Sequence, residues 1–551
     1  MIPLTGGYGR SIIGEFFITN MFAIMTLIFL AFIVLLVINY RGFVNPFGKI
    51  SKKTWSVLLV IFIIGFVLRN DSYFYGFANF DGLHYQETAN LFFKTGLYVK
   101  GCAIGNVHDC KLYHQALFPA GFPYLIVLLY YIFGQNSLLA MILPAFSGSL
   151  TVILVFLITY SLFKKEEIGL YTSLVFALIP MELVISGSAA VRPVSDFFMA
   201  LAVLFFLLAL EKNEVKLWSL FAVTFSYCIY VRQENSILFV PMLLLFVAKN
   251  KLTMNSFETK KIVNFIKKYW LPLAIFIISQ IPVQHWILFG ELGLSAGSLF
   301  SPTYFPYTAP VMLTLFFTDY SWIRVLFNPI TSILLFAGIY FVFKGKYRTR
   351  MAFLWLWFLS FFLMQAFYFQ CWGYPQNFCL GNMQRYMTTL SLPYSMISGF
   401  VLFRMSEKIK ISKLAFLAMI FIMLFITSHI NLPATLFKDA RLEEADIGDM
   451  IVAINKTGKD CLIFTSQSAA PDSDMLSENN RRWVDIYMIM SSKAQWTWEE
   501  VKNSTCIILI KDYKCRQIAD EECNFIYKNF DMEFLFKENS VEAYSLRLKT
   551  S

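Results

Sequence analysis

Long apolar stretches separated by short charged segments dominate this chain of 551 residues. A helix that crosses a lipid bilayer needs about 20 mostly apolar residues, and stretches close to this length recur along most of the sequence. The pattern predicts about 12 membrane-spanning helices in a mostly α-helical, polytopic bundle. The expected spans are 16–38, 54–69, 137–163, 168–186, 194–210, 217–231, 235–248, 270–289, 326–343, 351–369, 387–403 and 414–431.

Composition supports the bilayer as the solvent of this bundle. Hydrophobic residues make up 57% of the chain and charged residues only 15%, so a single water-soluble core is a poor explanation. Charged residues follow the first expected span, and no small-residue cleavage site does. We therefore expect this span to be a retained anchor and not a removed signal peptide.

Lysine and arginine concentrate in alternate loops between the expected spans. The basic segments are 41–53, 164–165, 249–268, 344–350 and 404–413. Cytoplasmic loops of membrane proteins carry an excess of these residues, which places the basic segments in the cytoplasm. Both termini and the segments 69–136, 290–325, 371–385 and 431–551 then lie outside. This asymmetry accounts for the net charge of +10 without a nucleic-acid partner.

The cysteines agree with this orientation, because all but Cys228 fall in segments expected outside. An even number of outside cysteines favours disulfides in an oxidising compartment. The alternatives are free thiols or a metal site, and the absence of a CxxC pair disfavours the metal site. The expected pairs are Cys102 with Cys110, Cys371 with Cys379, Cys461 with Cys506, and Cys515 with Cys523. We expect a multi-pass protein of a prokaryotic cell membrane rather than of the endoplasmic reticulum.

Two outside segments are expected to be folded. In the loop 70–136, residues 83–93 have an amphipathic helical pattern, and the Pro-interrupted apolar segment 118–136 predicts a second helix at the membrane surface. We therefore divide the chain into a membrane module, 1–432, that includes this loop, and a small α/β domain, 433–551. In the tail, Cys461 and Cys506 open two strand candidates at the same register, as expected for neighbouring strands.

Asp81 stands at the start of the helix predicted in the outer loop, and Tyr85 follows four residues later near the same face. Taken alone, an Asp at this place would serve only as a helix cap. However, Asp81 and Tyr85 are accompanied by Gly96 and Tyr98, and by the segments SGSAAVRPVSDFF, YVRQENSILFVP and MQRYMTTLSLPY. This set resembles the GT-C glycosyltransferases, with protein O-mannosyltransferases and lipid A aminoarabinose transferases as the nearest relatives. One departure is Gly82, because many members have Glu after the Asp.

The resemblance implies transfer of a sugar from a polyprenyl-phosphate donor to an acceptor hydroxyl at the outer face, with inversion. Asp81 is the candidate base that accepts the hydroxyl proton. Arg385 is the first candidate and Arg232 the second for binding the donor phosphate, because a guanidinium binds phosphate through paired hydrogen bonds. The candidate substrate-binding residues are His84, Tyr85, Arg192, Glu234 and Tyr386.

Several alternatives remain open. Glu234 is also suited to be only the ion-pair partner of Arg232, and Asp196 can pair with Arg192 one helical turn away. A flippase for lipid-linked sugars would use buried charges as a binding path. No cofactor is indicated, and a divalent metal held by Asp81, His84 and His114 is disfavoured because the chain has only five His residues and no HxH spacing. The expected partners are membrane lipids, the lipid-linked donor, and a glycan, lipid or protein acceptor.

Overall fold

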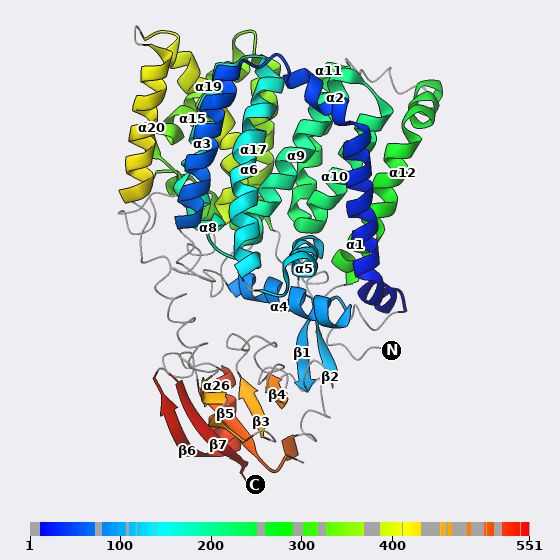
Figure 1. The fold of residues 1–551 in the computed structure, drawn as a ribbon, viewed down its shortest axis with the longest axis vertical. Helices are drawn as coiled ribbons and strands as arrows, with labels where there is room; N and C mark the ends of the chain where they lie inside the picture. The colour runs from blue at the N-terminus through cyan, green and yellow to red at the C-terminus, as the bar shows by residue number, and fades with distance from the viewer. Residues whose placement is uncertain are drawn as a thin grey trace.

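The fold is taken from a computed structural model, and helices that stand side by side form most of it (Figure 1). The structure describes residues 12–71, 80–105, 110–116, 118–136, 138–250, 259–289, 301–317, 327–367, 386–409, 412–430, 452–454, 456–458, 461–465, 482–485, 501–502, 504–511, 521–539 and 541–549. A β-sheet lies beyond one end of this bundle. We call this end of the bundle the sheet end.

The helices follow the apolar stretches of the sequence. They are α1 (Ile12–Ile38), α2 (Tyr40–Val44), η2 (Asn45–Phe47), α3 (Lys52–Asp71), α4 (Phe80–Thr95), α5 (Gly121–Phe133), α6 (Leu138–Phe163), α7 (Glu166–Ala177), α8 (Pro180–Ser186), α9 (Val191–Lys212), α10 (Val215–Val231), η4 (Gln233–Leu238), α11 (Phe239–Lys249), α12 (Thr259–Phe289), η6 (Pro302–Tyr304), α14 (Phe305–Leu315), α15 (Pro329–Ala337), α16 (Tyr340–Phe343), α17 (Arg348–Phe367), η7 (Met387–Leu390), α19 (Ser391–Ser406), α20 (Lys413–Ile430) and α26 (Glu521–Asn529). Each expected span therefore coincides with a helix or with a broken helix.

Among the described residues, five helices are long and apolar enough to cross a membrane by themselves. They are α1, α3, α6, α9 and α17. The pair α7 and α8 makes a sixth candidate if the two count as one span, and the chain bends by 61° between them. Helices α5, α10 and α20 and the segment Pro329–Phe343 are apolar but shorter.

Glycines let the helices of the bundle approach closely. A Cβ atom on Gly399 of α19 would lie 2.6 Å from the Cα of Thr172 in α7. A Cβ atom on Gly121 of α5 would lie equally close to the backbone of Tyr230 in α10. Small residues at helix contacts are typical of membrane bundles, where van der Waals packing between helices replaces the hydrophobic effect.

Two helices from the outer loop lie at the sheet end of the bundle. Helix α4 runs across this end (Figure 1), as the amphipathic pattern of residues 83–93 predicts. Helix α5 replaces the second surface helix expected in 118–136, but most of its residues are buried. Its Gly121 carbonyl accepts a hydrogen bond of 3.0 Å from the hydroxyl of Tyr227, and its Tyr124 hydroxyl donates one of 3.1 Å to Thr26 Oγ1. The helix expected in this segment is therefore present and packed against the bundle, and its position at the membrane surface stays a prediction.

Seven described strands form one sheet, in the order β2-β1-β4-β3-β5-β7-β6. The strands are β1 (Val99–Gly105), β2 (Cys110–Gln115), β3 (Leu462–Thr465), β4 (Arg482–Asp485), β5 (Ile507–Lys511), β6 (Phe530–Glu538) and β7 (Val541–Leu548). Strands β4, β3 and β5 are parallel neighbours, and the other pairs are antiparallel. The hairpin β1–β2 belongs to the outer loop, so the sheet joins two segments that the sequence division keeps apart.

One expected disulfide is present in the sheet. Cys461 and Cys506 are bonded, and their Cα atoms lie 4.6 Å apart. Each precedes one of two parallel strands, and Leu462 pairs with Ile507 in register, as the sequence predicts. Cys523 is also disulfide-bonded, whereas its expected partner Cys515 lies outside the described residues.

The other expected pairs stay predictions. Cys102 and Cys110 lie on the hairpin β1–β2, where their side chains are not described, and Cys371 and Cys379 lie outside the described residues.

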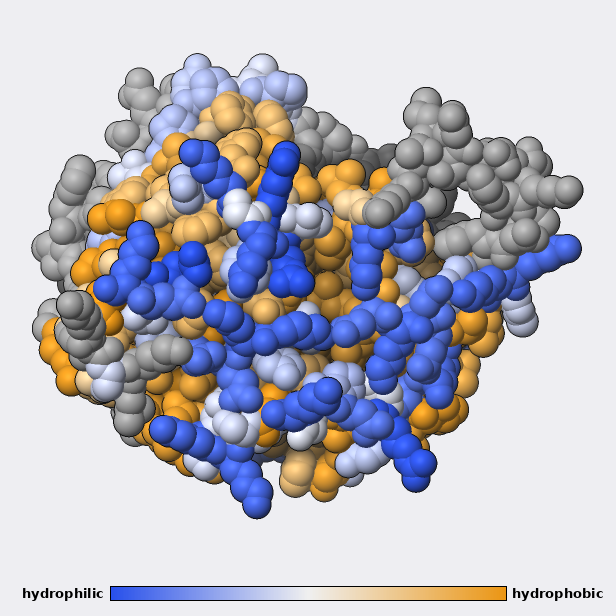
Figure 2. Space-filling view, turned by 90° about the horizontal axis from the view of Figure 1, so that it is seen from above, coloured by the Kyte–Doolittle hydropathy of each residue, from blue (hydrophilic) through white to orange (hydrophobic). Residues whose placement is uncertain are grey.

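The basic segments meet at the bundle end opposite the sheet. Lys164 Nζ lies 2.8 Å from Glu211 Oε2, and Lys165 Nζ lies 3.1 Å from Glu407 Oε1. The Nζ of Lys212 donates a hydrogen bond of 3.0 Å to the carbonyl of Gly42. Figure 2 views this end and shows hydrophilic residues spread across it. Exposed ion pairs of this kind contribute little to stability. They matter here because they show that the basic segments lie together at one end of the bundle.

We predict that replacing both Cys461 and Cys506 with Ser destabilises the tail by up to about 4 kcal/mol, the chain-entropy value for a loop of this length. The two cysteines are 45 positions apart in the sequence, and the segment between them gains freedom in the unfolded state. Limited proteolysis and thermal unfolding of the purified protein measure the effect. Cys228→Ser is the matched control, because Cys228 is a free thiol. Equal tail stability in the double variant and the wild type would contradict this prediction.

Candidate functional site

Charged side chains are buried inside the bundle near its sheet end. Arg69, Glu182 and Asp196 are fully buried, and Arg192 is 4% exposed. They come from α3, α8 and α9, whose ends meet there (Figure 1). A charged group at membrane depth is costly, so such residues face a polar interior and mark functional sites.

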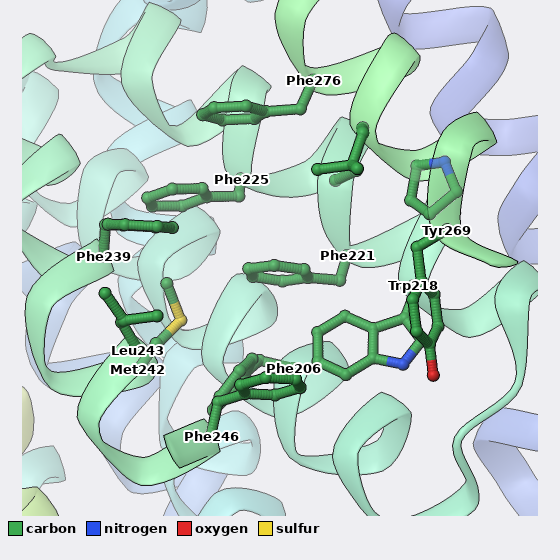
Figure 3. A pocket seen from close by; sticks show the side chains of 13 residues that line it. Phe206, Trp218, Phe221, Phe225, Phe239, Met242, Leu243, Phe246, Tyr269 and Phe276 are labelled. Atoms are coloured by element: carbon green, nitrogen blue, oxygen red, sulfur yellow. The ribbon is translucent and has the colours of Figure 1, made fainter. Parts of the chain in front are cut away.

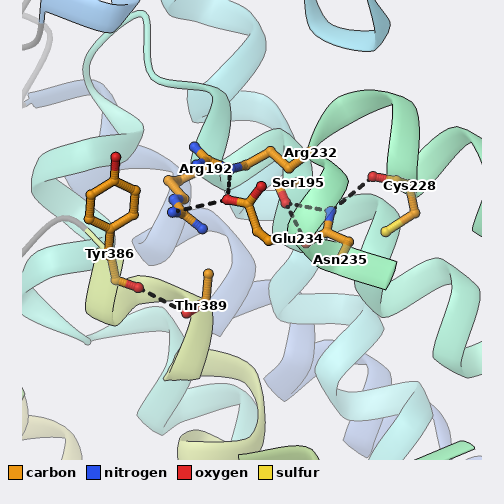
Figure 4. A network of polar contacts seen from close by, with 8 residues as sticks. All are labelled: Arg192, Ser195, Cys228, Arg232, Glu234, Asn235, Tyr386 and Thr389. Carbon is orange, nitrogen blue, oxygen red and sulfur yellow. Dashed lines mark hydrogen bonds and ion pairs between the residues drawn. The ribbon is translucent and has the colours of Figure 1, made fainter. Parts of the chain in front are cut away.

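A single carboxylate joins two arginines in this region (Figure 4). Glu234 Oε1 lies 3.3 Å from Arg192 Nη2 and also accepts a hydrogen bond from Arg232 Nε. The ring of Tyr386 lies beside both guanidinium groups, with its centroid 5.0 Å from Arg192 Cζ and 5.9 Å from Arg232 Cζ. We call these four residues the arginine cluster.

A break in the helix brings Arg232 and Glu234 into the cluster. Helix α10 ends at Val231, Arg232 has an extended backbone, and the chain continues as the 3-10 helix η4. Asn235 holds this break, because its Nδ2 donates hydrogen bonds of 2.9 Å to both the Cys228 carbonyl and Ser195 Oγ. The side chain of one buried Asn therefore fixes α10, η4 and α9 relative to one another.

The arginine cluster is suited to bind an anion. Its two guanidinium groups face one carboxylate, which leaves one formal positive charge. Arg232 and Glu234 keep 14% and 19% of their side-chain surface exposed, whereas Arg192 is almost fully buried. A guanidinium group binds phosphate through paired hydrogen bonds, and the attraction is strong where water is largely excluded.

Two more carboxyl groups lie behind the cluster. Glu182 interacts electrostatically with Arg69 and Arg192, and Asp196 interacts with Glu182, Arg192 and Arg232. Asp196 thus lies near Arg192, as helical spacing predicts, but the ion pair of Arg192 is with Glu234. Neither Glu182 nor Arg69 was expected from the sequence. A signal was available, because Glu182 is a charge within an apolar segment and Arg69 stands at the end of one.

The structure places only some of the expected site residues. It brings Arg192, Arg232, Glu234 and Tyr386 together. Arg385, the residue before Tyr386, lies outside the described residues.

The outer-loop candidates lie on α4. Asp81 and His84 belong to its first turns at the sheet end, but their side chains are not described. Tyr85 is 2% exposed, and its ring stacks on Phe118 with centroids 4.5 Å apart and meets Phe122 edge-on. The ring of Tyr85 therefore holds α4 against α5. Its role in substrate binding stays a prediction.

A separate apolar cavity of about 280 Å³ lies between α9, α10, α11 and α12 (Figure 3). Its walls are apolar and aromatic side chains, among them Phe206, Trp218, Phe221 and Phe276. The residues that line this cavity include no carboxylate, histidine or cationic side chain.

We predict that Glu234→Gln destabilises the protein and makes it more responsive to anions. The two guanidinium groups lose the carboxylate that they share. Removing one partner of a fully buried ion pair lowers the free energy of unfolding by about 3–5 kcal/mol, and the loss is smaller here because the pair is partly exposed. Inorganic pyrophosphate should then raise the Tm of the variant more than that of the wild type, since it supplies the missing negative charge.

Glu407→Gln is the control, because Glu407 is shared by Lys165 and Arg404 at the opposite end of the bundle. Equal responses to pyrophosphate in the Glu234 variant and in this control would show that the arginine cluster binds no anion.

Comparisons with known proteins agree with this arrangement. A family model described as dolichyl-phosphate-mannose-protein mannosyltransferase matches residues 118–286, a segment that includes Arg192, Arg232 and Glu234. A search of curated proteins found no match.

Among solved structures, ArnT from Cupriavidus metallidurans bound to undecaprenyl phosphate is similar with a TM-score of 0.58 and 11% identity. Its apo form has the same TM-score at 12% identity. Both comparisons cover 90% of this chain and 98% of the ArnT chain. The apo oligosaccharyltransferase of Archaeoglobus fulgidus has a TM-score of 0.48 and 12% identity, over 90% of this chain and 74% of that one.

At this level of identity, the likeness to ArnT shows a shared fold. The chain is thus similar to the mannosyltransferase family over residues 118–286, and it has the GT-C type of membrane fold seen in ArnT.

Proposed function

We propose that this protein transfers a sugar from a polyprenyl-phosphate donor to an acceptor hydroxyl, with inversion, at the extracytoplasmic face of a prokaryotic membrane. The acceptor is a glycan, a lipid or a protein. The observation that carries the proposal is the convergence of Arg192 and Arg232 at the sheet end of the bundle, where Asp81 lies in the first turn of α4.

Two features support a lipid phosphate as the leaving group. Insertion of one arginine at membrane depth costs about 2.5–3.5 kcal/mol, and the cluster holds two arginines around one carboxylate. ArnT, whose fold this chain shares, was crystallised with undecaprenyl phosphate. A donor with a phosphate at this depth and a prenyl chain in the membrane satisfies both constraints.

In the proposed reaction the Asp81 carboxylate accepts the proton of the acceptor hydroxyl. The oxygen of that hydroxyl attacks the anomeric carbon of the sugar. The bond between this carbon and the phosphate oxygen breaks from the opposite side, which inverts the configuration. Negative charge grows on the leaving phosphate, and preorganised guanidinium groups stabilise it. We assign this role to Arg385 and to Arg232, which lies beside Arg192 and Tyr386.

We predict that Asp81→Asn lowers kcat about 10²- to 10⁴-fold, the range for loss of a general base. Arg232→Ala and Arg385→Ala should each lower kcat about 10²-fold or more, because they weaken stabilisation of the leaving group. The assay supplies purified protein with polyprenyl-phosphate sugars of several kinds and measures donor consumption. Arg404→Ala is the control, because Arg404 pairs with Glu407 at the opposite end.

Two outcomes would overturn this scheme. Full activity of Asp81→Asn would remove Asp81 from the mechanism. Movement of the lipid between leaflets without donor consumption would favour the flippase.

We also predict that the sheet end faces the outside of the cell. On intact cells, a membrane-impermeant maleimide should label Glu533→Cys, in the tail, whose side chain is 69% exposed. Lys216→Cys, at the basic end, has comparable exposure and should react only after permeabilisation. The reverse labelling pattern would place the proposed reaction on the cytoplasmic side.

A further inference from the structure

Arg69 is buried where α3 passes the break between α7 and α8. Two glycines leave room for its side chain. A Cβ atom on Gly65 would lie 3.0 Å from Arg69 Nη1, and one on Gly148 would lie 3.0 Å from Arg69 Nε and 2.7 Å from Ser186 Oγ. The bundle thus encloses a guanidinium group in a space that a methyl group would fill.

Arg69 holds the backbone at the helix break. Its Nη1 donates hydrogen bonds to the Gly65 carbonyl at 3.1 Å and to the Ala177 carbonyl at 3.4 Å. Ala177 is the last residue of α7, and the chain bends by 61° beyond it into α8. The guanidinium also lies 5.6 Å from the ring centroid of Phe176. A positive group at the C-terminus of α7 is favoured by the helix dipole.

The short helix α8 carries Glu182 from this break toward the arginine cluster. Glu182 is fully buried and interacts electrostatically with both Arg69 and Arg192. Arg192 in turn contacts Glu234 and the ring of Tyr386. Glu182 is thus linked electrostatically to Arg69 at the helix break and to Arg192 in the arginine cluster.

We propose that Arg69 is a positioning residue for the donor phosphate and acts through Glu182. It fixes the bend between α7 and α8, and it offsets the negative charge of Glu182. Arg192 is then held beside Glu234 rather than drawn toward Glu182. This inference rests on the proposed function, because it assigns the phosphate of the donor to the arginine cluster.

Charge balance gives the proposal a specific consequence. Without Arg69, the carboxyl groups of Glu182, Asp196 and Glu234 face only Arg192 and Arg232. The cluster then presents less positive charge to a phosphate. Removing the charge of Glu182 as well restores the balance, so a second substitution should rescue the first.

The test measures donor KM, acceptor KM and kcat for three proteins: wild type, Arg69→Gln, and Arg69→Gln combined with Glu182→Gln. The single variant should raise donor KM about tenfold, a coupling of ordinary size between linked groups, and leave acceptor KM unchanged. The double variant should recover most of the donor affinity. A role for Arg69 in folding alone predicts no such recovery, and a double variant as weak as the single one would refute the proposal.

A glycine pair tests the same idea without removing any charged group. Gly148→Ala pushes a methyl group against Arg69 and should also raise donor KM. Gly169→Ala introduces a similar clash between α6 and α7, but against the ring of Phe156, 2.6 Å away. It should lower stability without a selective change in donor KM. Equal changes in donor KM for the two alanine variants would refute the positioning role.

Binding of polyprenyl phosphate without a sugar, measured by thermal shift, distinguishes failure of the proposed function from failure of the role of Arg69. If the wild type neither binds this lipid nor consumes donor, the proposed function fails. If the wild type does both and Arg69→Gln binds and turns over donor normally, only the role of Arg69 fails.

Discussion

A guanidinium group inside a membrane bundle needs hydrogen bonds and counter-charge, and this requirement shapes the sheet end of the molecule. Arg69 donates hydrogen bonds to two backbone carbonyls, and Arg192 and Arg232 share the carboxylate of Glu234 as their counter-charge. A regular helix has few free carbonyls to offer, because its own amides use them. Helix breaks in this bundle lie beside the charges: of the two carbonyls that accept from Arg69, that of Ala177 ends α7, although that of Gly65 lies within α3.

Three breaks follow this rule. The first separates α7 from α8 beside Arg69, the second is the 3-10 helix η4 after Arg232, and the third is η7 before α19, next to Tyr386. Irregular backbone at membrane depth is tolerated only where protein or a polar cavity surrounds it. The three breaks lie beside the buried charges of the sheet end, whereas described residues at the opposite end form exposed ion pairs.

The membrane helices could be predicted from the sequence because their signal is local, about 20 apolar residues in a row. The same holds for Cys461 and Cys506, which open two strands at one register. The pairing of the hairpin β1–β2 with strand β4 could not be predicted, since it joins residues that are far apart in the chain. In the site, Arg192, Arg232 and Glu234 were found through motifs. Glu182 and Arg69 were missed because each lies in a segment that otherwise reads as a plain membrane helix.

The sheet adds a constraint that the membrane helices alone do not supply. Helix α4 leads directly into β1, and β1 pairs with β4 of the tail at Ile104 with Val484 and Gly105 with Trp483. Strands β6 and β7 share eight register pairs, so the two pairs between β1 and β4 make a weaker junction within the described sheet. A weak junction opens more readily than the rest of a fold. The tail is therefore connected, through a junction of two described register pairs, to the segment that follows α4 and its Asp81.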